Sequence, residues 1–539
     1  RQKIYTIETP DKLLEQINKT LPFTKKAKDE RGEVFTPMEL VEKMLDTLNE
    51  LPEEVWKNPN LKWLDPAAGM GNFPVAVYMR LMEGLKDVKD YRDEEKRRKH
   101  ILENMLYMVE LDKTNVFMMK KIFCGKKYEL NIFEGSFIDG KYKDEIDIFN
   151  IIDEKKEVKK KECRKICEIE NKICNYNTGK CIKAPKKIKA PKKKENIKFL
   201  NKIKEFNNNF DIIMGNPPFN SGGVGKGGGI IWKDFVFKSF NIMLKNNGYL
   251  LMIHPQGWRK PTSKKASAGD IWNLFKNYNL QKLKIINDSE KIPNFPDVDY
   301  YLLNKNKVKK KTLILNDNKY YDLYNLPFIP HLINKESISI INKVLNKNGE
   351  KFNIIYNQTV KPEKGVKNIL GTPHYHYYDV DKNLYQEVFH KYKDKPDYLN
   401  NPKIIMTYNG GKEKANLYAI YISKEIGTTN NTMYQIVKHQ DNKNNLIKFL
   451  NSKLINFILK ITQYSAPPNY KNEFNILNLF SKPNEGDIQN QEDIYRLFKL
   501  TKDEIKLIED NTKDFKEIKG GFKSKKHISM KSHKRNKSI

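Results

Sequence analysis

The residues Asn216-Pro217-Pro218-Phe219 form the most specific chemical pattern of the chain. They follow a short apolar segment, 210–214, that is typical of a buried strand. Two prolines fix the backbone at the strand end, so that the Asn216 side chain and the Pro217 carbonyl are aimed at one point. Both groups accept hydrogen bonds, and together they can hold the two protons of an amino group. The Phe219 ring offers a flat face for stacking. The pattern therefore indicates chemistry at an amino nitrogen.

A glycine loop forms the second pattern. Asp65-Pro-Ala-Ala-Gly-Met-Gly-Asn-Phe73 follows an apolar segment and precedes a helical pattern. Glycine lets the backbone approach a ligand closely, and a helix N-terminus offers free N–H groups. Farther along, Glu110 ends the apolar segment 106–110. An acid at this place accepts hydrogen bonds from ribose hydroxyls in Rossmann-like sheets, whereas a solvated strand-end glutamate is the alternative. The spacing favours a nucleotide-type cofactor.

These residues need a sheet to position them. Between about residues 36 and 304, short apolar segments alternate with helical patterns, which predicts an α/β fold with a doubly wound, Rossmann-like sheet. Seven strands are expected, at 61–64, 106–110, 130–133, 210–214, 249–254, 283–287 and 298–303. Thr36 is expected to cap the first helix, with Pro37 at its first helical position.

Composition divides the chain further. We expect an N-terminal extension (1–33), a catalytic domain (34–326), a second α+β domain rich in Tyr and Asn (327–484), and a C-terminal helix with a basic tail (485–539). A Lys- and Cys-rich insertion at 142–204 interrupts the catalytic domain and is expected to be an exposed arm.

The whole constellation resembles the adenine-N6 DNA methyltransferases of restriction–modification systems. Those with the gamma motif order place the cofactor motifs first, the catalytic motif next and target recognition last. The loop beginning at Asp65 is similar to their usual DPACGSGNF, and Val34-Phe-Thr-Pro37 to their FTP element. The resemblance covers about residues 32–484 and implies a methyltransferase sheet that binds S-adenosylmethionine, followed by a target-recognition domain.

The resemblance also implies roles for individual residues. Those expected to hold and stack on the target adenine are Asn216, Pro217, Pro218, Phe219 and Phe295. Those expected to bind the cofactor are Phe35, Thr36, Pro37, Asp65, Ala67, Gly69, Gly71, Glu110, Ser136, Phe137 and Asn216. Ser136 departs from the family, which commonly has Asp there, so a weaker contact with the cofactor adenine is expected. Phe295 fits a loop aromatic that caps the core equally well.

Two segments near these motifs leave alternatives open. The glycine-rich run 221–229 lacks a phosphate-loop pattern and is expected to form a lid over the base. Four cysteines, Cys163, Cys167, Cys174 and Cys181, are candidates for zinc, although only the first pair has the spacing of familiar sites. Residues 173–182 resemble the short two-cysteine modules of large DNA virus proteins, which implies a viral source.

Charge indicates the partner. The chain has 99 Lys and Arg against 67 Asp and Glu, a formal net charge of +32, which favours a polyanion. No apolar run is long enough to span a membrane, and the expected location is the cytoplasm, or for a viral protein the host cytoplasm or the virion. The expected function is methyl transfer to N6 of adenine in a specific duplex DNA sequence after base flipping, with any restriction endonuclease as a separate partner. The alternatives are an N-methyltransferase acting on RNA or protein glutamine, and a non-catalytic DNA-binding protein.

Overall fold

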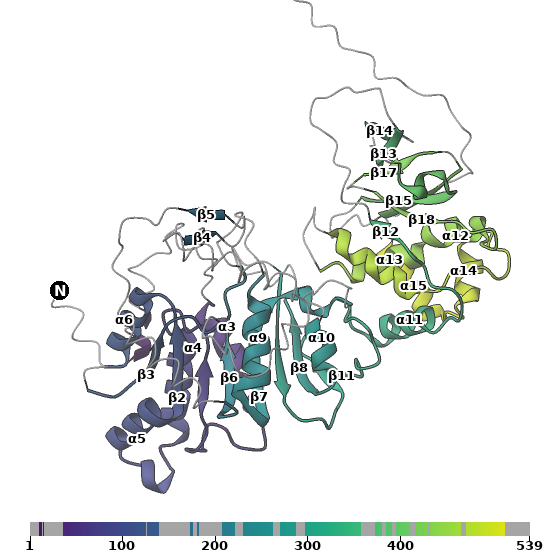
Figure 1. The fold of residues 1–539 in the computed structure, drawn as a ribbon. Helices are drawn as coiled ribbons and strands as arrows, with labels where there is room; N and C mark the ends of the chain where they lie inside the picture. Colours follow the sequence, from purple (N-terminus) through teal and green to yellow (C-terminus); the bar gives the residue numbers. More distant parts are fainter. Residues whose placement is uncertain are drawn as a thin grey trace, which may run out of the picture. The chain divides into compact units, whose positions relative to one another are not determined.

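The computed structural model divides into two compact units, Arg1–Phe328 and Ile329–Ile539, close to the boundary expected after residue 326 (Figure 1). Each unit is considered by itself below. The residues described are 10–12, 14–15, 36–124, 127–138, 173–175, 180–182, 207–220, 230–261, 270–286, 297–356, 372–379, 384–390, 395–409, 416–423, 425–429, 432–464 and 470–512.

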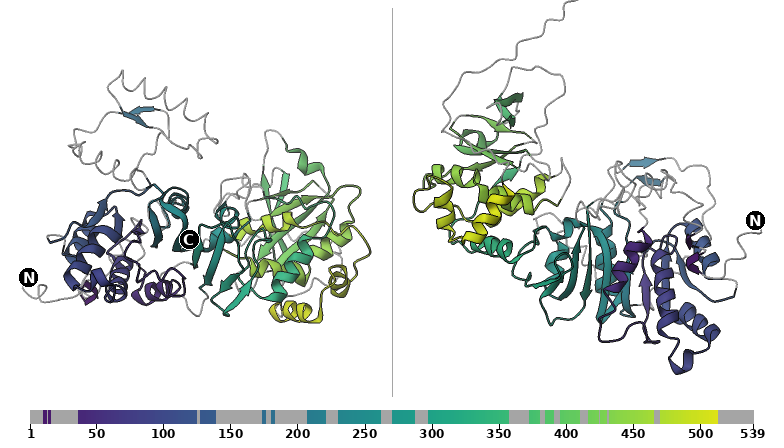
Figure 2. Two further views of the ribbon diagram at one scale, coloured as in Figure 1. Left: turned by 90° about the horizontal axis from the view of Figure 1, so that it is seen from below. Right: turned by 180° about the vertical axis from the view of Figure 1, so that it is seen from behind.

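The first unit is built on a nine-stranded sheet of order β11-β10-β8-β9-β7-β6-β1-β2-β3 (Figures 1 and 2). Its strands are β1 (Trp63–Asp65), β2 (Leu106–Glu110), β3 (Asn131–Glu134), β6 (Phe210–Gly215), β7 (Leu244–Pro255), β8 (Asn279–Ile285), β9 (Val298–Asn304), β10 (Thr312–Ile314) and β11 (Lys319–Tyr321). All seven expected strands are present. The two additional strands, β10 and β11, extend the edge beyond β8.

The strand order changes direction at the centre of the sheet. From β1 the sheet grows one way through β2 and β3 and the other way through β6 and β7, all in parallel. β9 runs antiparallel between β7 and β8, so the sheet is mostly parallel but not uniformly so. In open α/β sheets, ligands bind beyond the carboxyl ends of the strands at such a switch point. Here that place lies between β1 and β6.

Helices cover the sheet because its strands are apolar on both faces. Every residue of β1, β2 and β9 is buried, as in sheets with helices on either side. The main helices are α3 (Met38–Asp46), α4 (Asn72–Gly84), α5 (Glu94–His100), α6 (Lys113–Ile122), α9 (Trp232–Lys238) and α10 (Asp270–Phe275). α3 packs on α4, and α9 packs on α10.

The expected cap of the first helix is wrong by one residue. Pro37 itself is the N-cap residue of α3, with extended backbone angles and no side-chain capping bond. Thr36 is 4% exposed, and its carbonyl accepts a hydrogen bond of 2.8 Å from Asn72 Nδ2. Thr36 therefore joins the entry of α3 to the glycine loop.

Two further strands lie within the lysine-rich insertion. β4 (Ile173–Asn175) and β5 (Lys180–Ile182) pair in antiparallel fashion, with Cys174 opposite Cys181 in the backbone register. The side chains of these residues, and the whole of Cys163 and Cys167, lie outside the described part of the structure.

The second unit is α+β. Its strands β12 (Ile355–Tyr356), β13 (Thr372–Asp379), β14 (Leu384–His390), β15 (Lys403–Asn409), β16 (Asn416–Ile422), β17 (Gly427–Thr428) and β18 (Met433–Ile436) form sheets of order β12-β18-β15-β16 and β14-β13-β17. Its helices are α11 (Lys335–Leu345), α12 (Lys443–Leu450), α13 (Lys453–Ile461), α14 (Gln491–Leu497) and α15 (Lys502–Asn511). α15 packs on α11 and α13, so residues up to 511 belong to this unit.

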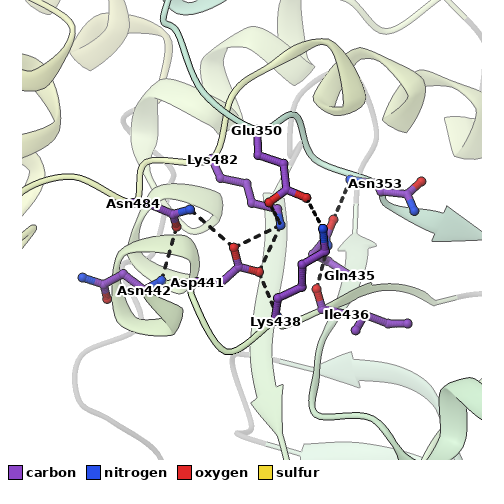
Figure 3. A network of polar contacts seen from close by, with 9 residues as sticks. All are labelled: Glu350, Asn353, Gln435, Ile436, Lys438, Asp441, Asn442, Lys482 and Asn484. Atoms are coloured by element: carbon purple, nitrogen blue, oxygen red, sulfur yellow. Dashed lines mark hydrogen bonds and ion pairs between the residues drawn. The ribbon is translucent and has the colours of Figure 1, made fainter.

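A buried polar network joins three segments of the second unit (Figure 3). The Lys482 side chain is 1% exposed and lies 3.0 Å from Asp441 Oδ2 and 3.3 Å from Glu350 Oε2. Asn484 Nδ2 donates to Asp441 Oδ1 at 3.4 Å, and the Lys438 amide donates to Asp441 Oδ2 at 2.9 Å. The network fixes the entry of α12 against the chain that follows the 3-10 helix ending at Leu479.

Candidate active site

The sheet brings the predicted residues together at the carboxyl ends of four neighbouring strands. Asp65 ends β1, Glu110 ends β2, and Asn216 follows β6 directly. Ser136 lies two residues beyond the end of β3. Because these strands stand side by side in the order β3-β2-β1-β6, side chains far apart in the sequence share one edge.

Glu110 holds the glycine loop in place. Its Oε2 accepts a hydrogen bond of 2.7 Å from the Gly69 amide, and its Oε1 accepts one of 2.7 Å from the Asp112 amide. A carboxylate oxygen can accept more than one hydrogen bond, so a carboxylate at this place is suited to ligand hydroxyls. The loop also requires its glycines: φ is 56° at Gly69 and 100° at Gly71. A Cβ on Gly71 would lie 3.2 Å from Met119 Cγ.

Asn72 supplies an acceptor that the sequence did not single out. It lies at the start of α4 and is 8% exposed. Its Nδ2 donates to the Thr36 carbonyl, whereas its Oδ1 has no hydrogen-bond partner among the described residues. A buried acceptor without a partner costs about 1–3 kcal/mol. An ammonium group of a bound ligand would satisfy it, which fits the amino-acid part of S-adenosylmethionine.

Asp65 is fully buried beneath this loop. Its Oδ1 accepts a hydrogen bond of 3.0 Å from the Ala67 amide. Burial raises the pKa of Asp65 to about 8, while the Ala67 amide acts in the opposite direction and the charge of Glu110 adds to the increase. The Asp65 carboxyl is therefore protonated at neutral pH in the ligand-free protein.

Gly215 connects Asp65 to residues 216–219, which we name the catalytic segment after their predicted role. It is the last residue of β6, immediately before Asn216, and its φ is 152°. A Cβ at this position would lie 2.7 Å from Asp65 Oδ1, closer than real Cβ atoms approach other atoms. The sequence shows a glycine between an apolar strand and two prolines, but it cannot show that Asp65 packs against it.

The catalytic segment is held by backbone hydrogen bonds to residues 230 and 231. The Asn216 Oδ1 atom is buried, and Phe219 is 7% exposed. The Ile231 amide donates to the Phe219 carbonyl at 3.2 Å, and Asn220 pairs with Ile230 as an isolated antiparallel bridge. The glycine-rich run 221–229 lies between the two sides of this bridge, outside the described residues.

Residues 230 and 231 lead into a cluster of buried aromatic and polar side chains. The Trp232 ring, at the start of α9, stacks on the His254 ring with centroids 4.1 Å apart. Burial lowers the pKa of His254 to about 3, so the ring is neutral, and its Nε2 lies 2.9 Å from the Tyr301 hydroxyl. Next to it, Arg259 and Asp299 form an ion pair with both side chains 0% exposed. This edge of β7 and β9 is rigidly packed.

Lys238 connects the catalytic side with the loop after β3. It is 8% exposed, although it lies on α9, and its Nζ donates to the Phe137 carbonyl. The same Nζ lies 4.8 Å from the centre of the Phe137 ring, which stacks on Phe235 at 5.4 Å. Phe137 thus has an aromatic neighbour and a cation beside it, at the expected place of the cofactor adenine.

Several predicted residues remain untested. Phe35 and Phe295 lie outside the described residues. In the described part of the chain, no group of three or more His, Cys, Asp or Glu side chains could hold a metal ion. Because the cysteine side chains of the insertion are not described, zinc stays a prediction. None of the described helices is both long and apolar enough to cross a membrane.

The chain is also similar to known proteins. The chain is 32% identical over 310 residues to an uncharacterised adenine-specific methylase of Mycoplasma pneumoniae, covering 52% of this chain and 69% of that protein. The chain belongs to the adenine-specific methylase family. Residues 104–292 of this methylase also match the family of Eco57I restriction-modification methylases. The matched range includes Glu110, Ser136 and the catalytic segment at Asn216. The relative is bacterial, and a viral source stays a prediction.

Solved structures resemble the methylase over larger parts of the chain. A DrdV–DNA complex matches 95% of this chain and 60% of its own, with 10% identity and a TM-score of 0.46. The type IIL enzyme MmeI in complex with DNA matches 85% and 69%, with 11% identity and a TM-score of 0.45. A modification subunit of a putative type I restriction enzyme from Vibrio vulnificus YJ016 matches 57% and 52%, with 13% identity and a TM-score of 0.34. The methylase thus spans about half the length of that subunit.

Proposed function

We propose that this methylase transfers a methyl group from S-adenosylmethionine to N6 of adenine in a specific duplex DNA sequence, after the base leaves the helix. One observation carries the proposal. The buried Asn216 Oδ1 lies at the switch point of the sheet, one residue from the glycine that packs on Asp65. An amide acceptor and a cofactor-type loop are therefore joined at the place where ligands bind such sheets.

The residues at this edge fit the cofactor. The Gly69 and Gly71 backbone and Glu110 would hold its nucleoside part, with Ser136 and Phe137 beside the adenine. Asn72 Oδ1 would accept from its ammonium group, near Thr36 and Pro37. The bound cofactor supplies a sulfonium-activated methyl group. No acid or base of the chain has to form a covalent bond with the substrate.

The catalytic segment would bind the amino group of adenine. Asn216 Oδ1 and the Pro217 carbonyl would accept hydrogen bonds from its two N–H groups, which draws the nitrogen out of conjugation and leaves its lone pair free to attack the methyl carbon. Pro217 and Pro218 fix this geometry, and Phe219 and Phe295 are proposed to stack on the base. Transfer would form the N6–carbon bond as the sulfur–carbon bond breaks, leaving the sulfur as a neutral thioether, and the nitrogen would then lose one proton to water. Positioning contributes most of the rate.

The partner that follows from this chemistry is duplex DNA. A base inside the helix cannot reach a buried amide, so the enzyme must extrude it. We propose that the second unit reads the sequence, and that any restriction endonuclease is a separate protein. The high positive charge of the chain supports association with phosphates.

Parallel assays of labelled methyl transfer to duplex DNA, RNA and protein test the proposal. Wild-type enzyme is expected to label DNA, with N6-methyladenine as the product. Asn216→Ala is expected to lose transfer at least about 100-fold and to retain cofactor affinity, because one acceptor is missing inside a buried site. Asp65→Ala is expected to lose cofactor affinity by calorimetry. Labelling of RNA or protein alone, or an active Asn216→Ala variant, would contradict the assignment.

A further inference from the structure

A lysine-rich loop between β9 and β10 has no role in the reaction proposed above. Its sequence is Lys305-Asn-Lys-Val-Lys-Lys-Lys311. We name its four exposed lysines, at 307, 309, 310 and 311, the basic loop. Because β9 runs antiparallel to β7, the last residue of β9, Asn304, lies opposite Tyr249 near the start of the apolar part of β7. The basic loop therefore lies at one end of the strands, and Asn216 lies at the other end.

The backbone of this loop is held at both ends. The Lys305 amide donates to the Gly248 carbonyl at 2.8 Å, and the Asn247 amide donates to the Lys305 carbonyl at 3.1 Å. The Lys310 amide donates to Asn279 Oδ1 at 3.2 Å, and Thr312 Oγ1 donates to the Leu280 carbonyl at 2.8 Å. The lysines are thus presented by a fixed backbone between two strands.

The charges of the basic loop are not neutralised within the described structure. No carboxylate of the described residues forms an ion pair with its four lysines, whereas Lys245 and Lys282 of the same unit lie 2.7 Å and 2.6 Å from carboxylates. The first two acids that follow the loop in the sequence accept hydrogen bonds in turns. Asp317 and Asp322 accept hydrogen bonds from the Lys319 and Tyr324 amides. A cluster of like charges of this kind favours an anionic partner.

Exposed apolar groups lie beside the lysines. Val308, within the loop, is 66% exposed. Tyr320, opposite Leu313 on the neighbouring strand β11, is 64% exposed. Lysines can also protect an exposed sheet edge from pairing with another chain. That explanation fits Lys319 on the edge strand β11, but not the four lysines of the loop, which precede β10.

The basic loop is far from Asn216 along the strands. Asn216 is level with Ile253 of β7, and the loop begins level with Gly248. At about 3.3 Å per strand residue, the two lie at least about 16 Å apart along the strands. A target adenine held at Asn216 would enter at the carboxyl ends of β1 and β6, whereas the basic loop lies at the other ends of the neighbouring strands.

We propose that the basic loop binds the phosphates of a second stretch of duplex DNA, distinct from the stretch that carries the target adenine. The proposal rests on DNA being the substrate. Phosphate contacts of lysine carry no sequence information and release counterions. Such a surface would hold the enzyme on long DNA while the catalytic edge releases one site and finds another.

A charge-matched pair of variants tests this inference. The first is K307Q/K309Q/K310Q/K311Q. The control, K43Q/K57Q/K86Q/K127Q, removes the same charge from four lysines of the same unit that each pair with a glutamate. The sites that wild-type enzyme methylates are first mapped in long DNA. Both variants are then assayed on two unmethylated substrates, a short duplex that contains one such site and a duplex of several hundred base pairs. Long-DNA affinity is also measured against salt concentration by fluorescence anisotropy.

The basic-loop variant is expected to methylate the short duplex within twofold of wild type and the long duplex with at least tenfold lower kcat/KM. Its salt slope on long DNA should fall by about 0.9 for each phosphate that the loop no longer neutralises. The proposal would be overturned if kcat/KM on long DNA decreased equally in the control variant, or if the basic-loop variant kept wild-type affinity for long DNA. An acidic protein would then be the better candidate for the partner of the loop. If wild-type enzyme methylates neither duplex, the proposed function fails, and the anisotropy measurement still decides whether the basic loop binds DNA.

Discussion

Asp65 combines an acidic side chain with a fully buried position, and this combination makes the stability of the ligand-free enzyme depend on pH. In the unfolded chain the carboxyl ionises near its ordinary pKa of 3.8, whereas burial raises its pKa in the folded protein to about 8. Between these values the folded state binds the additional proton. The stabilisation that this proton provides is therefore complete below about pH 4, and it is lost progressively as the pH rises towards 8.

Asp65→Asn removes this titration and retains an acceptor for the Ala67 amide. Relative to wild type, we expect the free energy of unfolding of the variant to increase from pH 5 to pH 8 by at least about 1.4 kcal/mol, the equivalent of one pKa unit. Denaturant titrations across this range measure the difference, with Asp317→Asn, at an exposed turn, as the control for charge loss. A difference that stays constant with pH would show that the Asp65 carboxyl is ionised throughout.

Gly215 is the second residue with a direct consequence for the site. A methyl group there would lie 2.7 Å from Asp65 Oδ1, and the backbone angle of 152° is unfavourable for any other residue. We expect Gly215→Ala to displace both Asp65 and Asn216, so that cofactor affinity and kcat each fall at least about tenfold. Gly486→Ala is the control, because Gly486 also has a positive φ but no atom lies within 4 Å of its Cβ position. Normal kinetics of Gly215→Ala would exclude the close packing of these residues.

At the same scale, the sequence reveals motifs but not their partners. Asn216 and the glycines at 69 and 71 were predictable because their chemistry is encoded in consecutive residues. Asn72, Gly215 and Lys238 were not, since each matters through a group distant in the sequence: the Thr36 carbonyl, the Asp65 carboxyl and the Phe137 carbonyl. A lysine on α9 gives no sign in the sequence that it is buried.

Among the elements, the strands that belong to the alternation of apolar segments and helices were predictable, whereas β10 and β11 at the end of the strand order were not. β10 and β11 have three residues each, and the pairing of β10 with β8 and of β11 with β10 supplies the stability that their length does not. Apolar residues recur through 445–461 without a break, whereas α12 and α13 are separate helices. Ser452 lies between them and caps α13, accepting a hydrogen bond of 3.2 Å from the Ile455 amide. Local side-chain capping thus overrides a continuous apolar pattern.

The network around Lys482 leads to a prediction about the second unit (Figure 3). Lys482→Met leaves the Asp441 carboxylate, whose side chain is 0% exposed, without its ammonium partner. Removing one member of a buried ion pair typically costs about 3–5 kcal/mol, and we expect a loss of this order in the unfolding free energy of the full-length protein. Lys438→Met is the control: its side chain is 51% exposed, and a loss below about 1 kcal/mol is expected. Equal destabilisation of the two variants would contradict a special role for burial.

At the scale of the whole molecule, all the residues proposed to bind the cofactor and the target adenine belong to one of the two units. The first unit, which ends at Phe328, contains every described residue to which we assign a role in the proposed transfer reaction. The second unit contains none of them, yet it has one antiparallel sheet, one mixed sheet and five α-helices among the residues described. A separate unit of this size, rich in Tyr and Asn, fits the reading of base edges.

Exchanging the second unit with that of a related enzyme tests this division. The exchange should begin at Ile329 and extend through Thr512, because Glu504 pairs with Lys343 and the Asn511 carbonyl accepts from Lys460. An exchange that ends at Asn484 would separate these partners and is expected to yield a less stable protein. Sequencing of methylated sites should show the recognition sequence moving with the exchanged unit, while N6-methyladenine remains the product because the catalytic edge is unchanged. If the original sequence preference persists in the stable chimera, recognition lies in the first unit, with the lysine-rich insertion at 142–204 as the segment to exchange next.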